Sequence, residues 1–251
     1  MMKFKKNINY NTRKVHRYLG VIIGIQFLFW TIGGLYFSWN NMDDVHGETL
    51  LKQEKHYFST IDFVKIQKGI DSLKTEVTVD SIHSIEIKEA FGEPLVQLRY
   101  FEDHHLKIQL IIAETGKLRP PFSGQECLEL AEQQLKKPIK IVKAKLYNKH
   151  STGAHHEYRG KQLPAYAFTL DHPTNTTIYV STELGEIISV RNNNWRRFDF
   201  LWMLHTMDYN SRDYITNWTL RIFSGLGILT IFSGFFLFYK TSTTIRKIRN
   251  K

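Results

Sequence analysis

Two long stretches without a charged residue constrain this chain more than any other feature. The first covers residues 18–39 and the second covers residues 222–239, which are 22 and 18 residues long. An α-helix rises about 1.5 Å per residue, so each stretch can cross a hydrocarbon core about 30 Å thick. We therefore predict two transmembrane helices, at residues 18–39 and 217–239, with a water-soluble segment between them.

Basic residues flank the two predicted spans on the sides away from the middle of the chain. They are Lys3, Lys5, Lys6, Arg13, Lys14 and Arg17 before the first span, and Lys240, Arg246, Lys247, Arg249 and Lys251 after the second. Such clusters stay in the cytoplasm, so residues 1–17 and 240–251 are expected to be cytoplasmic tails. Trp39 and Trp218 would mark the opposite boundary. The net charge of +10 then reflects topology and does not indicate nucleic-acid binding.

The first span also has the basic start of a signal peptide. Its apolar run is longer than a signal sequence needs, and no small-x-small cleavage site follows Trp39, so an uncleaved anchor is expected. The single cysteine, Cys127, cannot form an intramolecular disulfide. The domain between the spans must therefore be held together by packing.

An internal repeat lies between the spans. Residues 94–116 match residues 164–185 with one insertion, and in each copy a proline opens an alternating run that ends in an acidic turn with glycine. Alternation predicts half-buried strands at residues 95–100 and 166–170. Gly116 and Gly185 suit the closing turns because glycine adopts positive φ readily.

A helix is predicted before the strands of each repeat. Ser123 and Glu126 have the spacing of a capping box, and the apolar face that follows ends before Pro138. A strand is expected at residues 139–146, and a helix at residues 61–73 would begin the first repeat. The predicted fold is an α+β membrane protein with two tandem helix-plus-antiparallel-sheet units, at residues 40–119 and 120–194.

These units resemble PepSY domains, which are helix-then-sheet modules with a closing strand and turn. The flanks strengthen the resemblance. Residues 13–20, RKVHRYLG, are similar to the start of PepSY-associated transmembrane proteins, and so are residues 195–209, WRRFDFLWMLHTMDY. The resemblance implies a two-span member of this family in the bacterial inner membrane, with both termini cytoplasmic and the central domain periplasmic.

Some members of this wider family are implicated in ferric-siderophore reduction, with haem held by membrane histidines. This chain departs from those reductases because it has two predicted spans instead of four or more. Its cytoplasmic tails are also too short for a flavin or dinucleotide domain. The resemblance therefore implies at most an electron-transfer subunit for iron uptake, acting as a homodimer or within a larger membrane complex.

His16 is the first candidate ligand of haem b. His16, Gly20 and Gly24 fall on one face of a helix, and the two glycines would leave a flat space beside the imidazole. The same spacing permits a close helix–helix crossing, and His16 also fits an interfacial basic residue. These alternatives are open from the sequence.

His205 is the second candidate haem ligand. It lies in an aromatic segment at residues 195–216, with Trp202 and Tyr209 on its face and with Asp208 placed to fix the tautomer of a ligating imidazole. The segment equally suits an amphipathic helix at the outer membrane face. His16 and His205 would lie about 30 Å apart across the bilayer, so each haem would need a dimer that pairs each histidine with its mate.

Other polar residues give weaker signals. Arg221 is one turn inside the second span, where its side chain is expected to reach the outer surface. Two groups of histidines lack the spacing of a metal site, so no metal is expected; they are His104 and His105, and His150, His155 and His156.

Three functional hypotheses follow. The first is a haem-binding electron-transfer subunit whose PepSY units face a ferric-siderophore or protein partner. The second is a non-catalytic binding or regulatory module, anchored in the bilayer, that recognises a peptide or periplasmic protein. The third is a structural subunit of a larger membrane complex. A nucleophile elbow, a P-loop and a dinucleotide fingerprint are absent from the sequence, so it contains no self-contained catalytic motif.

Overall fold

A computed structural model describes the backbone of residues 2–52, 58, 60–212 and 214–243, and the side chains from residue 10 onward within those ranges. The chain forms two compact units. One consists of Asn41–Arg196, and the other combines Met1–Asn40 with Arg197–Lys251. Most of the predicted basic C-terminal tail, residues 244–251, lies outside the described residues.

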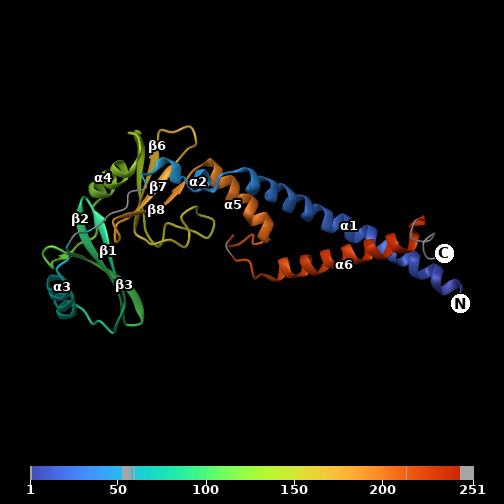
Figure 1. Cartoon of the computed structure of the whole chain (residues 1–251), viewed down its shortest axis with the longest axis horizontal. Coiled ribbons are helices and arrows are strands. Elements are labelled where there is room, and N and C mark those ends of the chain that lie inside the picture. The colour runs from blue at the N-terminus through green and yellow to red at the C-terminus, as the bar shows by residue number, and fades with distance from the viewer. Residues whose placement is uncertain (1, 53–57, 59, 213, 244–251) are drawn as a thin grey trace. The chain divides into compact units, whose positions relative to one another are not determined.

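Helices make up the unit that contains both ends of the chain (Figure 1). They are α1 (Met2–Trp39), the part of α5 (Asn193–Thr206) from Arg197 onward, and α6 (Trp218–Thr241). Helix α1 begins at Met2, so it also includes the segment expected to be a cytoplasmic tail. Tyr10–Trp39 and Trp218–Thr241 are long and apolar enough to cross a membrane, by length and composition.

Helices α1 and α6 pack side by side in opposite directions. His16 contacts Ser233 and Gly234, and Ile23 lies beside Gly227. Trp218 is nine residues before Gly227, and Ile32 is nine residues after Ile23. Because the two helices run in opposite directions, Trp218 and Ile32 lie at the same level. The predicted spans 18–39 and 217–239 are therefore staggered by about 10 Å. Residues 33–39 of α1 extend past the first residue of α6, and α5 packs beside α1 there.

The first half of the other unit is an antiparallel sheet of four strands with a helix on one face. The elements are α3 (Phe63–Glu76), β1 (Ser81–Ala90), β2 (Glu93–Glu102), β3 (His105–Ile112) and β4 (Leu118–Arg119), and the strand order is β1-β2-β3-β4. Asp62 caps α3 by accepting from two backbone amides. Ile66, Ile70 and Leu73 of the helix pack on Val96 and Leu98 of the sheet.

The second half repeats this arrangement. The elements are α4 (Gly124–Gln134), β5 (Ile141–Tyr147), β6 (Ala165–Leu170), β7 (Thr177–Ser181) and β8 (Glu186–Arg191), in the order β5-β6-β7-β8. A short helix, α2 (Met42–His46), and a 3₁₀ turn, η1 (Glu48–Leu50), precede both halves. The capping box of Ser123 and Glu126 is confirmed, since both of its hydrogen bonds form.

The closing turns occupy equivalent places in the two halves. Gly116 and Gly185 both have positive φ, 72° and 61°, as the sequence predicts. A Cβ on Gly116 would lie 2.3 Å from the carbonyl oxygen of Lys65 in α3, and one on Gly185 would lie 2.1 Å from the ring of Phe122, just before α4. Each closing turn is therefore pressed against the helix of its own half.

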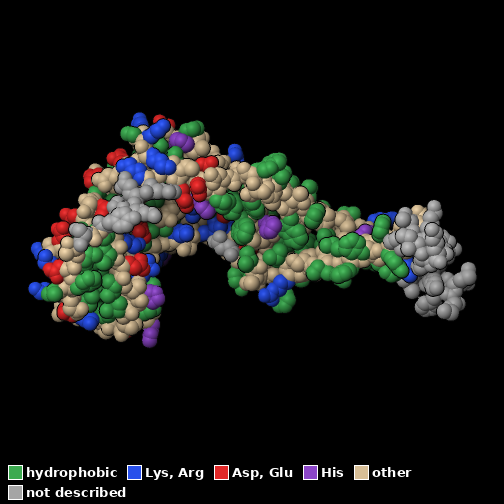
Figure 2. Space-filling view, in the orientation of Figure 1, with side chains coloured by type: hydrophobic (Ala, Val, Ile, Leu, Met, Phe, Trp, Pro, Cys, Tyr) green, Lys and Arg blue, Asp and Glu red, His purple; other side chains and the backbone are tan. Residues whose placement is uncertain are grey.

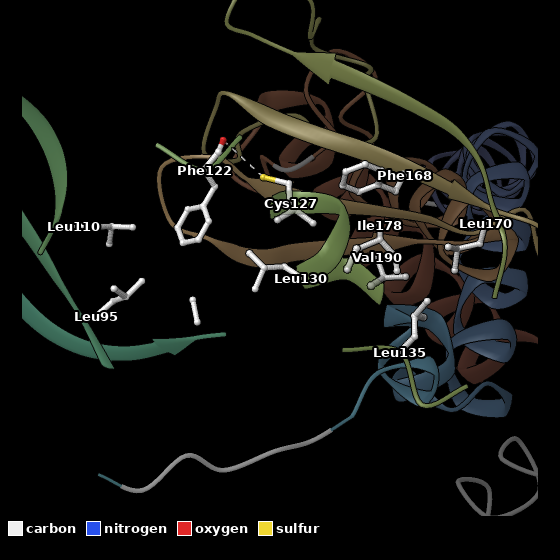
Figure 3. Close-up of a cluster of buried hydrophobic side chains, with 13 residues drawn as sticks. Leu95, Leu110, Phe122, Cys127, Leu130, Leu135, Phe168, Leu170, Ile178 and Val190 are labelled. Atoms are coloured by element: carbon white, nitrogen blue, oxygen red, sulfur yellow. Dashed lines mark hydrogen bonds between the residues drawn. The ribbon is translucent and has the colours of Figure 1, made fainter. Parts of the chain in front are cut away.

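One apolar core joins the two halves (Figure 3). Leu95 and Leu110 of the first sheet are buried in the same cluster as Phe122 and Leu130 of the second half. Phe91, in the turn after β1, lies with its ring centroid 6.3 Å from that of Phe122. The two sheets therefore belong to a single α+β domain, in agreement with the predicted fold class.

Candidate functional site

His16 is held in one orientation by helix α6. Its Nδ1 atom lies 2.7 Å from Oγ of Ser233, and that hydroxyl donates its proton to the carbonyl oxygen of Thr230 at 2.8 Å. A hydroxyl has one proton to donate, so Ser233 accepts from His16. With the Ser233 proton donated to Thr230, neutral His16 carries its proton on Nδ1, and its Nε2 has a lone pair with no hydrogen-bond partner among the described residues.

Glycine makes room for the His16 ring on α6. A Cβ added to Gly234 would lie 3.3 Å from Cε1 of His16. Gly20 and Gly24 differ, because a Cβ added to either would meet no atom within 4 Å. Neither glycine is used for the contact between α1 and α6. The space beside them is open to a cofactor or to a helix of another chain.

Aromatic rings surround His205 on helix α5. Its ring centroid lies 6.1 Å from those of Trp30 and Phe37 in α1, and 6.0 Å from that of Trp202, with which it stacks at an angle of 10°. The Nδ1 atom of His205 is buried and has no hydrogen-bond partner among the residues that the structure describes. His205 is therefore packed as an aromatic side chain.

Asp208 does not orient the His205 ring, so that prediction is wrong. Its carboxylate accepts from the backbone amides of Asn210, Ser211 and Tyr214, and from the hydroxyl of Ser211. These bonds fix the turn between α5 and α6. The carboxylate thus serves the backbone of its own loop, as aspartate commonly does in turns.

The two histidines lie at different levels along the axis of α1, His16 on α1 itself and His205 on the neighbouring α5. His16 is fourteen residues before Trp30, whose ring contacts His205, and this spacing corresponds to about 21 Å along the helix axis. A single haem within one chain cannot be held by both. The surroundings of His16 suit an axial ligand of haem. Ser233 supplies the hydrogen-bond partner for Nδ1, and Nε2 has no partner among the described residues. Around His205 the residues do not fit, because Nδ1 lacks such a partner.

Gln26 is an important residue that sequence reasoning missed. It is 5% exposed, and its Nε2 donates to the carbonyl oxygen of Leu204 at 2.9 Å. Trp30 Nε1 donates to the carbonyl oxygen of His205 at 2.8 Å, so α1 supplies donors to the last turn of α5. A signal was present in the sequence, since Gln26 is the one amide side chain in residues 18–39.

The other polar residues singled out from the sequence have structural partners or surface positions. Arg221 is exposed, and its guanidinium lies 5.2 Å from the ring centroid of Trp218, in accord with a side chain that reaches outward. In the loop that contains His155 and His156, the neighbouring Glu157 accepts from Arg196 and from the hydroxyl of Tyr179. Within the described part of the chain, no group of three His, Cys, Asp or Glu side chains is arranged to hold a metal ion.

A cavity of about 340 Å³ follows the edge strand β8 in the α+β domain. Its lining includes His46, Glu48, Lys161, Ser189, Arg191 and Trp195. The Oγ atom of Ser189 is buried and lacks a hydrogen-bond partner among the described residues. The cavity thus combines an edge strand, charged groups of both signs and a buried hydroxyl without a partner among the described residues.

The fold and these sites define an α+β protein with two antiparallel sheets and, near its ends, two helices apolar enough to cross a membrane. Comparison with protein-family models, with curated proteins and with solved structures gave no match.

Proposed function

We propose that this chain is a bacterial inner-membrane protein that holds a PepSY-type binding domain outside the cytoplasm. The observation that carries the proposal is the exposure of large apolar side chains around both terminal helices. They include Val21, Ile25, Phe27 and Leu28 of α1, and Ile228, Leu229, Ile231, Phe232 and Phe235 of α6. Apolar surface of this extent is unfavourable in water and favourable in a bilayer.

The distribution of charge supports the same placement. On the face shown in Figure 2, apolar side chains cover the helical unit, whereas Lys, Arg, Asp and Glu gather over the α+β domain. The exposed Arg13, Lys14 and Arg17 lie toward the N-terminal end of α1, and Lys240 lies at the end of α6. By the positive-inside rule both of these ends are cytoplasmic and the α+β domain is periplasmic.

A protease-protection experiment tests this placement. In spheroplasts, an external protease should cleave within residues 148–155, the mostly exposed start of the loop after β5, and should spare a tag at the C-terminus. The protein should also stay in the membrane fraction after an alkaline wash. Release by the wash, or cleavage of the tag with the domain intact, would contradict the proposal.

The cavity along β8 supports a binding role for the domain. An edge strand offers free backbone groups to an extended peptide, and the cavity lies along such an edge. A photo-reactive residue at Lys161, which lines the cavity, should give a crosslinked product with a periplasmic peptide or protein in cells. The same residue at Val64, exposed on α3, is the control. Equal crosslinking at both positions would argue against a specific site.

The environment of His16 favours a second candidate function, electron transfer through haem b. His16 would hold the iron through Nε2, Ser233 would fix the ring, and Gly20 and Gly24 would face the porphyrin. A haem supplies one-electron transfer, which ferric-siderophore reduction requires. Because one chain offers a single well-partnered histidine at this level, the second axial ligand would come from His16 of a second copy in a homodimer.

A reduced-minus-oxidised absorption spectrum of the detergent-purified protein tests this candidate function. We expect a b-type haem signal that His16→Gln abolishes and that His205→Gln leaves largely intact. The matched control is His46→Gln, which changes an exposed histidine of the α+β domain. A protein that lacks the signal after purification from haem-replete cells would refute haem binding and would leave the anchored binding domain as the function.

A further inference from the structure

We propose that a second copy of this chain docks on the edge strand β1, with the two β1 strands antiparallel and related by a two-fold axis. The inference concerns the α+β domain alone and goes beyond both proposed functions. It depends neither on the cavity along β8 nor on haem at His16. Both copies contribute the same surface to such a contact, so that surface must be complementary to itself.

Three isoleucines of β1 leave apolar surface exposed at the edge of the first sheet. Ile82, Ile85 and Ile87 are 41%, 49% and 36% exposed. Their partners on β2 are buried in the core beneath α3; they are Tyr100, Leu98 and Val96. Helix α3 packs mainly on β3 and β4, at the opposite margin of the sheet. The isoleucines therefore extend that core to a margin where they remain open to solvent.

Strand β1 also leaves one side of its backbone without a strand partner. It is ten residues long and lies at the end of the strand order β1-β2-β3-β4. Within the part of the chain that the structure describes, no strand or bridge other than β2 pairs with it. After the irregularity between Ile82 and Ser84, its register with β2 is regular as far as Ala90. A regular, exposed edge of this kind is a template for a strand from another chain.

The charged residues of β1 are arranged to pair with themselves. Glu86 and Lys88 are two residues apart, so their side chains share one face of the sheet, and Ile85 and Ile87 share the other. If two β1 strands pair antiparallel with Ile87 on the two-fold axis, Glu86 of each copy lies directly opposite Lys88 of the other. Opposite charges in such cross-strand positions are stabilising, and like charges are destabilising. The register with Glu86 on the axis would instead oppose two carboxylates.

The same register brings the isoleucines together on the other face. Residues opposite each other in an antiparallel pair share a face, so a two-fold axis perpendicular to the sheet keeps both rows of isoleucines on the side of α3. Ile87 then meets Ile87 of the second copy, and Ile85 lies diagonal to it. Side chains at both spacings interact across strands. Pairing thus removes apolar surface from water while it satisfies backbone groups and charges.

The ion pair between Lys88 and Glu186 is compatible with this arrangement. The Nζ atom of Lys88 donates to both carboxylate oxygens of Glu186, at 2.8 and 2.7 Å. An ammonium group has three N–H donors, and the side chain of Lys88 remains 25% exposed. A third donor is therefore left for Glu86 of a second copy.

Strand β5 provides an internal comparison, because it is the equivalent edge strand of the second half. By the alignment of the repeat and the strand registers, Ile87 is equivalent to Leu146, and Glu86 is equivalent to Lys145. Strand β5 carries Lys143 and Lys145 and contains no acidic residue. Lysines protect an exposed edge, because a second copy would bring like charges together. Strand β1 has charges of both signs instead, and these can pair.

Disulfide formation between single cysteines tests the pairing. Full-length Ile87→Cys, reconstituted in lipid vesicles and treated with copper phenanthroline, should give a covalent dimer. It should form at least about tenfold faster than with Leu146→Cys, because paired positions hold the two sulfurs within disulfide distance. Leu146 is the matched control, since it is exposed at the equivalent place on β5. The native chain is the blank, because Cys127 is wholly buried. Equal rates at residues 87 and 146 would overturn the proposal.

Charge reversal tests the register. Adding Glu86→Lys to the Ile87→Cys chain should slow disulfide formation by about fivefold, because two pairs of lysines would replace two pairs of opposite charge. A nearby lysine makes a thiol more reactive, so its intrinsic effect has the opposite sign. A rate that stays the same or rises would overturn pairing with Ile87 on the axis.

Energy transfer between C-terminally labelled copies in the same vesicles tests the contact without a cysteine. Ile87→Asp would place two carboxylates on the axis and should abolish the transfer, whereas Leu146→Asp should preserve it. Both variants should keep the unfolding temperature of the native chain, since both side chains are exposed. Transfer that survives in a folded Ile87→Asp chain would place the contact on another surface and overturn pairing through β1. That result would leave the membrane placement and the binding role unchanged.

Discussion

His16 and Ser233 are 217 residues apart in the sequence, and a hydrogen bond of 2.7 Å joins them across helices α1 and α6. The hydroxyl proton of Ser233 is already donated to Thr230. With its proton donated to Thr230, the serine acts as an acceptor and favours the imidazole tautomer that carries its proton on Nδ1. The tautomer determines which nitrogen can bind another group.

Replacing this serine should release the tautomer. In Ser233→Ala, we expect ¹⁵N shifts of histidine-labelled protein to show His16 as a mixture of tautomers, whereas the native protein shows mainly the Nδ1–H form. His16→Gln identifies the signal. The loss in stability should be about 0.5–1.5 kcal/mol, the usual net contribution of one hydrogen bond. An unchanged ¹⁵N spectrum would show that Ser233 does not control the tautomer.

Gln26→Leu should loosen the end of α5. The variant keeps the size of the side chain but leaves the carbonyl oxygen of Leu204 without its donor, at a cost of about 1–3 kcal/mol if water cannot replace it. Thermal unfolding of the full chain in detergent and hydrogen exchange at residues 204–207 would measure the effect. Thr31→Val is the matched control, because within the described part of the chain the Thr31 hydroxyl bonds only to the carbonyl oxygen of Phe27 in its own helix. Equal effects of the two variants would contradict the capping role.

Gly116→Ala should destabilise the protein more than Gly92→Ala does. Both glycines have positive φ, 72° and 81°, so alanine pays a similar backbone cost of about 1–2 kcal/mol at each. A Cβ at residue 116 would also lie 2.3 Å from the carbonyl oxygen of Lys65, whereas one at residue 92 would meet no atom within 4 Å. Thermal unfolding should show an additional loss of about 1–3 kcal/mol for Gly116→Ala. Equal losses would mean that the turn and α3 move apart easily.

The capping box should make stability depend on pH. Hydrogen bonds from the backbone and hydroxyl of Ser123, with the nearby Arg119, lower the pKa of Glu126 below its ordinary value. A lowered pKa stabilises the fold above the ordinary glutamate pKa of about 4.3, and this contribution is lost as the pH falls through the folded-state value. Glu126→Gln can still accept at the cap, so between pH 6 and pH 3 its unfolding temperature should fall less than that of the native protein. If the unfolding temperatures of the native protein and of Glu126→Gln fell equally with pH, Glu126 would not be the source of the pH dependence.

Cys127 should be inert while the domain is folded. It is wholly buried, and burial raises the pKa of its thiol to about 12. Because the thiolate is the reactive form, a maleimide at pH 8 should leave the folded chain unmodified and should modify it fully after unfolding in guanidinium chloride. Mass spectrometry measures the extent of modification. Rapid modification of the folded chain would show that α4 opens locally.

Local features of the sequence predicted much of the α+β domain. The capping box, the strands around residues 95–100 and 166–170, and the two turn glycines depend on residues close in sequence, and the structure confirms them. The expected half-burial is wrong for the first of these strands, because its four consecutive residues 95–98 are all buried, on both faces of the sheet. The helix expected at residues 61–73 is shifted slightly to Phe63–Glu76, and the strand expected at residues 139–146 to Ile141–Tyr147. Helix and strand periodicity carry this information because neighbouring residues share a face.

Features that depend on distant residues were not predicted. The fourth strands β4 and β8 follow the closing turns, and β4 is only two residues long, too short for a periodic pattern. The stagger of α1 against α6 and the donors from Gln26 and Trp30 to α5 are set by side-chain packing between helices. An apolar helix offers similar side chains at every position along its length. Its sequence can therefore predict that it crosses a bilayer, but it does not predict the axial register at which it packs against a second helix.

The core shared by the two sheets has a consequence for how this repeat can be altered. Leu95 and Leu110 belong to the first copy, yet they are buried in a cluster that also contains Phe122 and Leu130 of the second. Neither copy could be exchanged, deleted or produced alone without uncovering these side chains. The two copies, although similar in topology, are therefore expected to unfold together as one cooperative unit.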